Sequence, residues 1–205
     1  MLQFYSIGVI SILSAISPGP DFVVITKYAL CESRRHAFFC AFGIALGILV
    51  HMSYCLLGLA LVISQSIVLF NAIKLLGAAY LIYLGIQGLR SPKKELQMAG
   101  ELAGTSTKTA YQAFKEGFTI NVLNPKCSLF MLSIFTMVIE PHTSIAVQAA
   151  YGFEIALIAF SWFCILASSI SLHFVKQRFA SAQHWVSRLT GVVLIFLGVK
   201  IALNK

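Results

Sequence analysis

The sequence Ser17-Pro18-Gly19-Pro20-Asp21 interrupts one long apolar segment, and Asn124-Pro125-Lys126 interrupts another. Proline lacks a backbone N–H and breaks a helix. Each break also carries a full charge, and a charge at bilayer depth costs several kcal/mol. Because the two breaks carry opposite charges, Asp21 and Lys126, they are hard to explain as irregularities of an ordinary apolar helix. We expect both breaks to be functional features.

The composition predicts a membrane protein. Of 205 residues, 59% are hydrophobic and 11% are charged, whereas soluble domains carry about 25% charged residues. One helix needs about 20 apolar residues to span a bilayer. We therefore expect an all-α integral membrane protein with a single domain, residues 1–205, that keeps its first segment after synthesis. The apolar segments predict six helices, the first and fourth broken: approximately 2–30, 37–63, 67–89, 113–139, 144–172 and 187–203.

The net charge of +8 is explained by membrane topology, so we expect no nucleic-acid partner. Basic residues gather after the first predicted helix, between the third and fourth, and between the fifth and sixth. The other connections hold almost none. This alternation is typical of loops retained in the cytoplasm. The alternation predicts that the chain is embedded in the lipid bilayer and that both of its termini are periplasmic.

Two sequence similarities indicate an internal repeat. Residues 81–87 read Leu-Ile-Tyr-Leu-Gly-Ile-Gln, and residues 194–200, 113 positions later, read Leu-Ile-Phe-Leu-Gly-Val-Lys. The two proline breaks lie 107 residues apart. The chain then divides into halves of three helices, about 1–90 and 113–205, joined by an exposed linker, 91–112. An odd number of spans inverts the second half, as in many secondary transporters, where paired helix interruptions mark the binding site.

The breaks supply groups that suit a free amino acid. Asp21 could meet its ammonium group, and Lys126 could meet its carboxylate. Asn121 and Asn124 lie three residues apart on one helical face and could bond substrate or unwound backbone. Alternatively, Asp21 and Lys126 pair only with each other, or Asp21 only caps the half-helix that follows. The predicted binding set is completed by the residues that shape the two breaks: Pro18, Gly19, Pro20 and Pro125.

Proton coupling has three candidates. Asp21 is the first. Glu154 lies inside the fifth apolar segment with no fixed cation beside it, so it could carry a proton or simply hydrogen-bond a neighbouring helix. Histidine titrates near neutral pH, but the position of His51 also fits a packing role. Its stripe contains small residues that allow close helix packing, within the chain or in a homodimer: Gly43, Gly47, Cys55 and Gly58.

Other residues carry no predicted chemistry. Tyr80, Tyr83 and Trp162 could line a cavity, although aromatic side chains in membrane helices more often pack or anchor at the interface. Five scattered cysteines form no C-x-x-C pair and are expected to be free thiols. The sequence holds no phosphate-binding loop, no H-E-x-x-H and no G-x-S-x-G. We therefore expect neither an enzyme nor a cofactor.

Several motifs together resemble the lysine-exporter/homoserine–threonine-resistance (LysE/RhtB) family, in order and nearly end to end. They are Ser17–Phe22, Arg34-Arg35, Gly43-Ile-Ala-Leu-Gly47 with His51, Gly77–Gly85 and Asn121–Lys126. The resemblance implies a bacterial inner-membrane exporter of amino acids with six helices and proton-motive-force coupling. The first break and the stretch Gly152-Phe-Glu154 are most similar to the threonine-exporter branch. Carried across, the family pattern places Asp21, Asn124, Pro125 and Lys126 on the transport path.

The leading hypothesis is therefore an efflux carrier for a small neutral amino acid of the threonine or homoserine type, working by alternating access. A divalent-cation exporter is the first alternative, and it would need several convergent oxygen ligands. A membrane module without transport activity is the second alternative. In that case the broken helices would tolerate substitution of Pro18 and Pro125.

Overall fold

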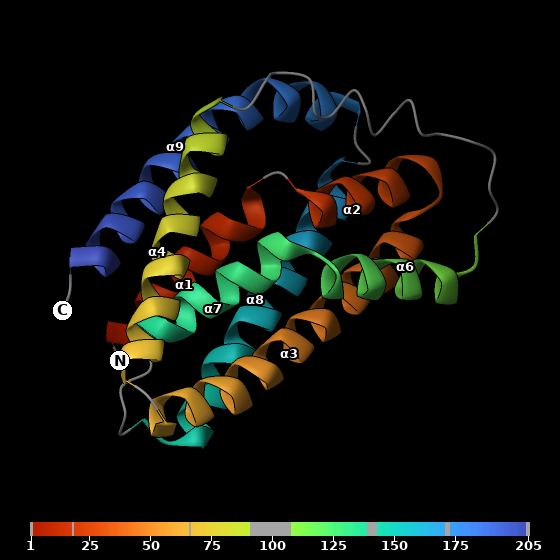
Figure 1. The fold of residues 1–205 in the computed structure, drawn as a ribbon. Helices are drawn as coiled ribbons and strands as arrows, with labels where there is room; N and C mark the ends of the chain where they lie inside the picture. The colour runs from red at the N-terminus through yellow and green to blue at the C-terminus, as the bar shows by residue number, and fades with distance from the viewer. Residues whose placement is uncertain are drawn as a thin grey trace.

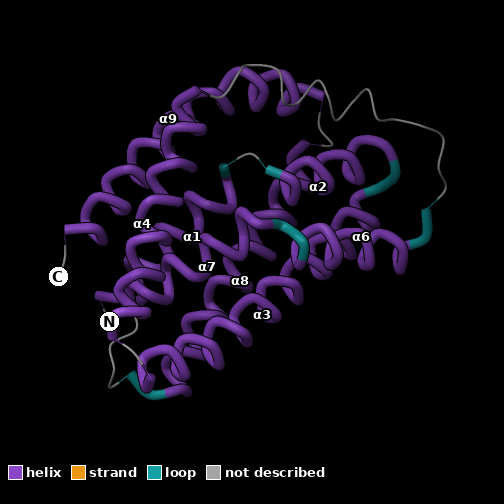
Figure 2. The backbone as a smooth tube through the Cα atoms, in the orientation of Figure 1, coloured by secondary structure: helices purple, strands orange, loops and turns teal. Residues whose placement is uncertain are grey.

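The computed structural model describes residues 2–17, 19–65, 67–90, 108–138, 143–170 and 173–203, and every regular element in these ranges is an α-helix (Figures 1 and 2). The predicted all-α fold is thus confirmed for the described residues. The helices in chain order are α1 (Leu2–Ile16), α2 (Pro20–Cys31), α3 (Arg34–Gln65), α4 (Ile67–Arg90), α6 (Ala110–Val122), α7 (Pro125–Val138), α8 (Ile145–Ile170) and α9 (His173–Leu203).

The first predicted break separates α1 from α2. Helix α1 ends at Ile16, and α2 begins at Pro20, with Gly19 as its N-cap in an extended conformation. A proline at the first helical position sacrifices no hydrogen bond, because that N–H has no partner within a helix. The segments Phe4–Ile16 and Pro20–Cys31 meet at 60°. Pro18, which was expected to shape this break, lies outside the described residues.

The second predicted break separates α6 from α7. The segments Ala110–Val122 and Pro125–Thr136 meet at 57°. Pro125 again occupies the first helical position, and the Oδ1 atom of Asn124 accepts a hydrogen bond of 3.0 Å from the backbone N–H of Lys126. Asn124 therefore caps α7, which is the structural role that the sequence allowed for it.

Three single helical segments are long and apolar enough to cross a membrane, and each of the two bent pairs can add one span. The single segments are Arg34–Gly58, Asn71–Arg90 and Ile145–Ile170. This finding covers up to five of the six predicted spans within the described residues. Helix α9, which contains the sixth predicted segment, begins at His173 rather than at residue 187.

The predicted linker is shorter at its C-terminal end than expected. We expected a loop to residue 112, but α6 begins at Ala110. Thr109 and Gln112 form a capping box, in which the Thr109 N–H donates to Gln112 Oε1 at 2.8 Å and the Gln112 N–H donates to Thr109 Oγ1 at 3.2 Å. These bonds satisfy backbone donors that a helix start leaves open. Residues 91–107 of the linker lie outside the described part of the chain.

Helix α3 lies at the centre of the packing, against α6, α8 and α2. Two glycines allow the closest approach: a Cβ atom on Gly43 would overlap the carbonyl oxygen of Phe114, and one on Gly117 would overlap that of Cys40. The predicted glycine stripe of α3 thus faces α6. Its last member, Gly58, has no atom within 4 Å of its Cβ position and does not take part.

Helices α4 and α9 lie side by side (Figure 1) and meet through the two segments that resemble each other. A Cβ atom on Gly85 would lie 2.6 Å from the Gly191 oxygen and 3.0 Å from the Ile195 nitrogen. One on Gly198 would lie 2.7 Å from the Ala78 oxygen and 3.2 Å from the Ile82 nitrogen. Residues 85, 78 and 82 of α4 correspond to residues 198, 191 and 195 of α9 at the repeat distance of 113. Each contact that Gly85 makes with α9 is therefore repeated by the contact that Gly198 makes with α4.

Candidate functional site

A cavity lies where the two breaks meet, enclosed by α1, α2, α3, α7 and α8. It offers about 60 Å³ to the centres of water-sized molecules. One water needs roughly 10–15 Å³ by this measure, so the space is sized for a few waters or one small solute. Apolar residues such as Phe22, Phe130 and Phe163 form much of the wall. The polar side chains on the wall are Ser11, Ser14, Ser17, Asp21, Asn124, Lys126 and Cys127.

One oxygen of the Asp21 carboxylate is hydrogen-bonded, and the other has no bond to any described residue. Its Oδ2 atom accepts hydrogen bonds from the side-chain amides of Asn121 at 3.0 Å and Asn124 at 3.2 Å. Its Oδ1 atom is buried and has no hydrogen-bond partner among the described residues. Because a buried carboxylate oxygen without a partner is costly, the unbonded Oδ1 of Asp21, a residue that lines the cavity, favours a positively charged ligand there.

Asn121 supports Asp21 from behind and does not line the cavity. It is fully buried, and its side chain fits against α3 because Gly47 has none: a Cβ atom there would lie 3.0 Å from the Cβ of Asn121. The thiol of Cys127 contacts the Oδ1 of Asn121 at 3.8 Å. Asn121 is thereby oriented with its amide group toward Asp21.

The ammonium group of Lys126 reaches across to the first break. It donates to the backbone oxygen of Ser17 at 3.0 Å and to the Ser17 hydroxyl at 3.1 Å. The Ser17 carbonyl follows the C-terminal end of α1, where the helix dipole is negative. Gly19 leaves room for the lysine, since a Cβ atom there would lie 3.3 Å from Nζ. The charged groups of both breaks are therefore hydrogen-bonded by polar groups of the other break.

His51 is buried and hydrogen-bonded on both ring nitrogens. Its Nε2 lies 2.9 Å from the backbone oxygen of Asn121, and its Nδ1 contacts the hydroxyls of Tyr54 and, at 3.3 Å, Ser128. It thus fixes the last turn of α6, since Asn121 lies one residue before the end of this helix. This arrangement matches the packing role that the sequence allowed. The histidine touches the backbone of Asn121, whose side chain holds Asp21.

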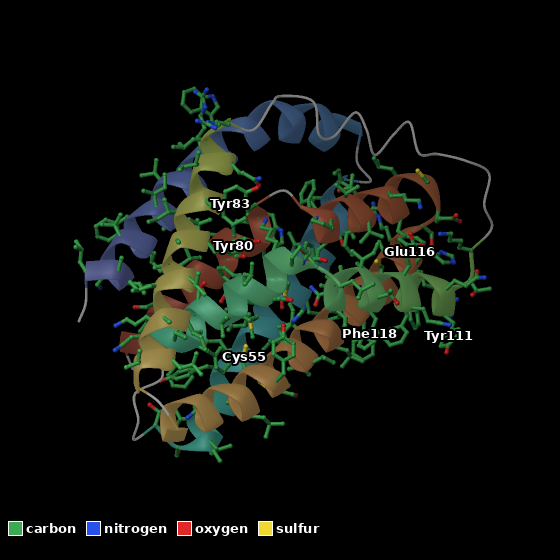
Figure 3. All side chains as sticks on the ribbon, in the orientation of Figure 1. Cys55, Tyr80, Tyr83, Tyr111, Glu116 and Phe118 are labelled. Carbon is green, nitrogen blue, oxygen red and sulfur yellow. The ribbon has the colours of Figure 1, made fainter. Side chains whose placement is uncertain are left out.

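Other candidate residues lie apart from the cavity. Glu154 on α8 faces α1: its Oε1 lies 3.2 Å from the Cβ position of Gly8, and its buried Oε2 has no hydrogen-bond partner among the described residues. Tyr80, Tyr83 and Trp162 do not line the cavity, and Figure 3 shows the two tyrosines on α4. Pro20 and Pro125 are exposed at the helix starts. These residues do not join Asp21 and Lys126.

Two sets of residues were missed by the sequence analysis. Ser11 and Ser14 on α1 and Ser17, directly after its last residue, follow one another at three-residue spacing, and all three line the cavity. This spacing on an apolar helix, ending at the first break, was a readable signal.

Glu116 is the centre of the other missed set. It lies on α6 (Figure 3) and accepts hydrogen bonds from Tyr28 at 2.7 Å, Lys27 at 3.4 Å and Lys108. Lys27 and Lys108 belong to the basic residues after the first predicted helix and between the third and fourth, which the sequence analysis explains by topology alone. Glu116 therefore links Lys27 of α2 and Lys108 to α6, and it does not line the cavity.

The five cysteines are free thiols, as expected. In the described part of the chain, no group of three or more histidine, cysteine, aspartate or glutamate side chains is arranged to hold a metal ion.

Comparison with known proteins gives full-length matches. The chain is 26% identical to the threonine efflux protein of Salmonella typhimurium, covering 100% of both chains. It is 28% identical to the leucine efflux protein of Salmonella choleraesuis, covering 98% of this chain and 95% of the relative. It is 30% identical to an uncharacterized membrane protein of Bacillus subtilis, covering 95% and 96%. No solved structure matches the chain.

The family model described as "LysE type translocator" matches residues 12–205, which include both breaks and every residue on the cavity wall except Ser11. Proteins of this family are transporters, and enzymes are not among the named relatives. The chain therefore belongs to the LysE type translocator family.

Proposed function

We propose that the protein exports a small neutral amino acid, of the threonine or homoserine type, across the bacterial cytoplasmic membrane. The observation that carries this proposal is that the cavity is lined both by Asp21, which has a carboxylate oxygen unbonded among the described residues, and by Lys126. A free amino acid carries the two complementary charges on one carbon atom. The names of the threonine and leucine efflux relatives support the same substrate class.

Each charge of the substrate has a defined counterpart. The substrate ammonium group would donate to Oδ1 of Asp21, while Asn121 and Asn124 keep Oδ2 in place. Its carboxylate would face the N-terminus of α7, where the helix dipole is positive and Lys126 adds a full charge. A lysine at a helix N-terminus opposes the dipole, so its position there favours recruitment of an anion over stabilisation of α7.

Transport would proceed by alternating access between two inverted halves of three spans each, residues about 1–90 and 113–205. The exchanged contacts of Gly85 and Gly198 support a two-fold relation between α4 and α9. The other contacts follow the same rule: α1 and α2 pack on α8, and their counterparts α6 and α7 pack on α3. An axis in the membrane plane would bring the two breaks together at the midplane, as in other transporters with inverted repeats.

The proton motive force would drive export, with Asp21, Glu154 and His51 as the candidates for proton coupling. Asp21 lines the cavity, and its Oδ1 atom is unbonded among the described residues. A proton and the substrate ammonium group would therefore compete for this carboxylate. Glu154 is buried at one oxygen without a partner among the described residues, and a proton there would remove the cost of a charge in hydrocarbon. The distribution of basic loops supports periplasmic termini.

The proposal is tested with vesicles loaded with a panel of labelled amino acids, with and without a pH gradient. We expect export of threonine or homoserine, faster with the gradient, and its loss by at least a hundredfold in Asp21→Asn. Glu32→Gln makes the same chemical change at the end of α2, outside the cavity, and should export normally. Undiminished export by Asp21→Asn would refute the proposed role.

A further inference from the structure

We infer that Ser11 recognises a hydroxyl group on the side chain of the transported amino acid and so determines specificity for hydroxy amino acids. The inference rests on the proposed function, because it places the substrate in the cavity between the two breaks. It assigns the substrate side chain, which neither Asp21 nor Lys126 can select, since every amino acid carries the groups that they bind.

The hydroxyl of Ser11 is buried without a partner. Ser11 is 3% exposed, it lines the cavity, and its Oγ atom has no hydrogen bond with any described residue. A buried polar group that lacks a partner is costly, and most such groups in native proteins are satisfied. A ligand hydroxyl in the cavity would supply the missing bond.

Other serines of this protein bond their own helix backbone, whereas Ser11 does not. A serine within a helix can bond the carbonyl oxygen four residues earlier. Ser53, Ser133 and Ser168 do this with Leu49 at 2.8 Å, Leu129 at 2.6 Å and Cys164 at 2.8 Å, respectively. Ser11 has a residue at the equivalent place, Ile7, but makes no such bond. A ligand in the cavity would therefore not have to displace an existing bond of this hydroxyl among the described residues.

An unbonded hydroxyl alone does not make a site. Thr26 and Thr190 are also buried, at 0% and 1% exposure, with unbonded hydroxyls among the described residues. Neither lines the cavity. Ser11 differs because it lines the same cavity as Asp21, whose Oδ1 atom is also unbonded among the described residues.

The spacing along α1 fits a small hydroxy amino acid. Ser11 and Ser17 are six residues apart, which is about 9 Å at a rise of 1.5 Å per residue. Ser17 marks the position of the Lys126 ammonium group. In threonine, the carboxylate and the hydroxyl lie roughly 4 Å apart, across bonds of about 1.5 Å. A hydrogen bond of about 3 Å from the carboxylate to Lys126 and another from the hydroxyl to Ser11 bring the total to about 10 Å. On this estimate, threonine is long enough to reach from Lys126 to Ser11.

Threonine and valine provide the test, because they differ in one hydroxyl against one methyl group. In loaded vesicles we expect the wild-type protein to export threonine faster than valine. We expect Ser11→Ala to slow threonine export about tenfold, the effect of one neutral hydrogen bond, and to leave valine export within twofold. Retained valine export shows that the variant is folded. Ser6→Ala, on an exposed position of the same helix, should change neither rate.

The outcomes separate this inference from the proposed function. Equal slowing of threonine and valine in Ser11→Ala overturns the inference, and so does equal export of both by the wild-type protein. Export of leucine without threonine also overturns the inference, although amino-acid export then stands. Absence of export for every amino acid in the panel refutes the proposed function and the inference with it.

Discussion

Replacing Gly85 by alanine places a methyl group in the contact between α4 and α9. Its Cβ atom would lie 2.6 Å from the carbonyl oxygen of Gly191, whereas an ordinary contact begins at 3.4 Å. The facing backbone must therefore retreat by about 0.8 Å. A helix backbone cannot rotate aside as a side chain can. The movement therefore separates α4 from α9 along the whole contact and loosens its packing. Overpacking of this kind costs about 1–3 kcal/mol.

The effect on stability can be measured as the thermal midpoint, Tm, of the purified protein in detergent. In a chain of this length, 1 kcal/mol corresponds to roughly 2–4 °C in Tm. Relative to alanine at a helical glycine without close contacts, we expect Gly85→Ala to lower Tm by roughly 2–12 °C. Gly198→Ala should lower it by a similar amount, because its Cβ atom would lie 2.7 Å from the Ala78 oxygen in the counterpart contact.

Gly58→Ala is the matched control, since no atom lies within 4 Å of the added Cβ. Alanine favours a helix by up to about 1 kcal/mol over glycine, so Gly58→Ala should leave Tm unchanged or raise it slightly. The close approach of α4 and α9 is refuted if Gly85→Ala melts like Gly58→Ala. The two-fold relation is refuted if Gly85→Ala and Gly198→Ala differ greatly in Tm.

Two further variants test the interactions around the cavity and at α6. Asn121→Ala removes one charge-assisted hydrogen bond to Asp21, so export in loaded vesicles should fall by roughly ten- to a hundredfold with little change in membrane insertion; an unchanged rate would contradict the supporting role of Asn121. Glu116→Gln leaves Lys27 and Lys108 without their shared counter-charge. Tm in low salt should fall by a few degrees, and the loss should shrink at high salt; a loss independent of salt would show that packing, not charge, is disturbed.

The breaks were predictable because proline acts locally. Pro20 and Pro125 each start a helix, and a rule based on the missing N–H of proline needs no knowledge of the rest of the fold. The small residues of α3 were predictable for a similar reason, since Gly43 and Gly47 share one helical face. The start of α9 was predicted too late because residues 173–186 include Lys176 and Arg178, which lower the local hydropathy.

The partners of the charged groups could not be predicted from local pattern. The hydrogen bond from Asn121 to Asp21 spans 100 residues, and that from Lys126 to Ser17 spans 109. Their formation depends on how the two broken helices meet. Ser11 was missed because a serine in an apolar helix looks the same in sequence whether it bonds its own backbone or faces a cavity. Only the packing of α1 against the breaks distinguishes the two.

The mutual bonding of the two breaks also has a consequence for how the protein is made. During synthesis Asp21 leaves the ribosome 100 residues before Asn121, the amide that will hold its carboxylate. Until Asn121 is made, the N-terminal half carries a carboxylate without its hydrogen-bond donors. It therefore cannot fold stably by itself in the hydrocarbon of the bilayer. We expect each half, expressed alone, to be degraded, and the two halves, expressed together as separate chains, to rescue each other.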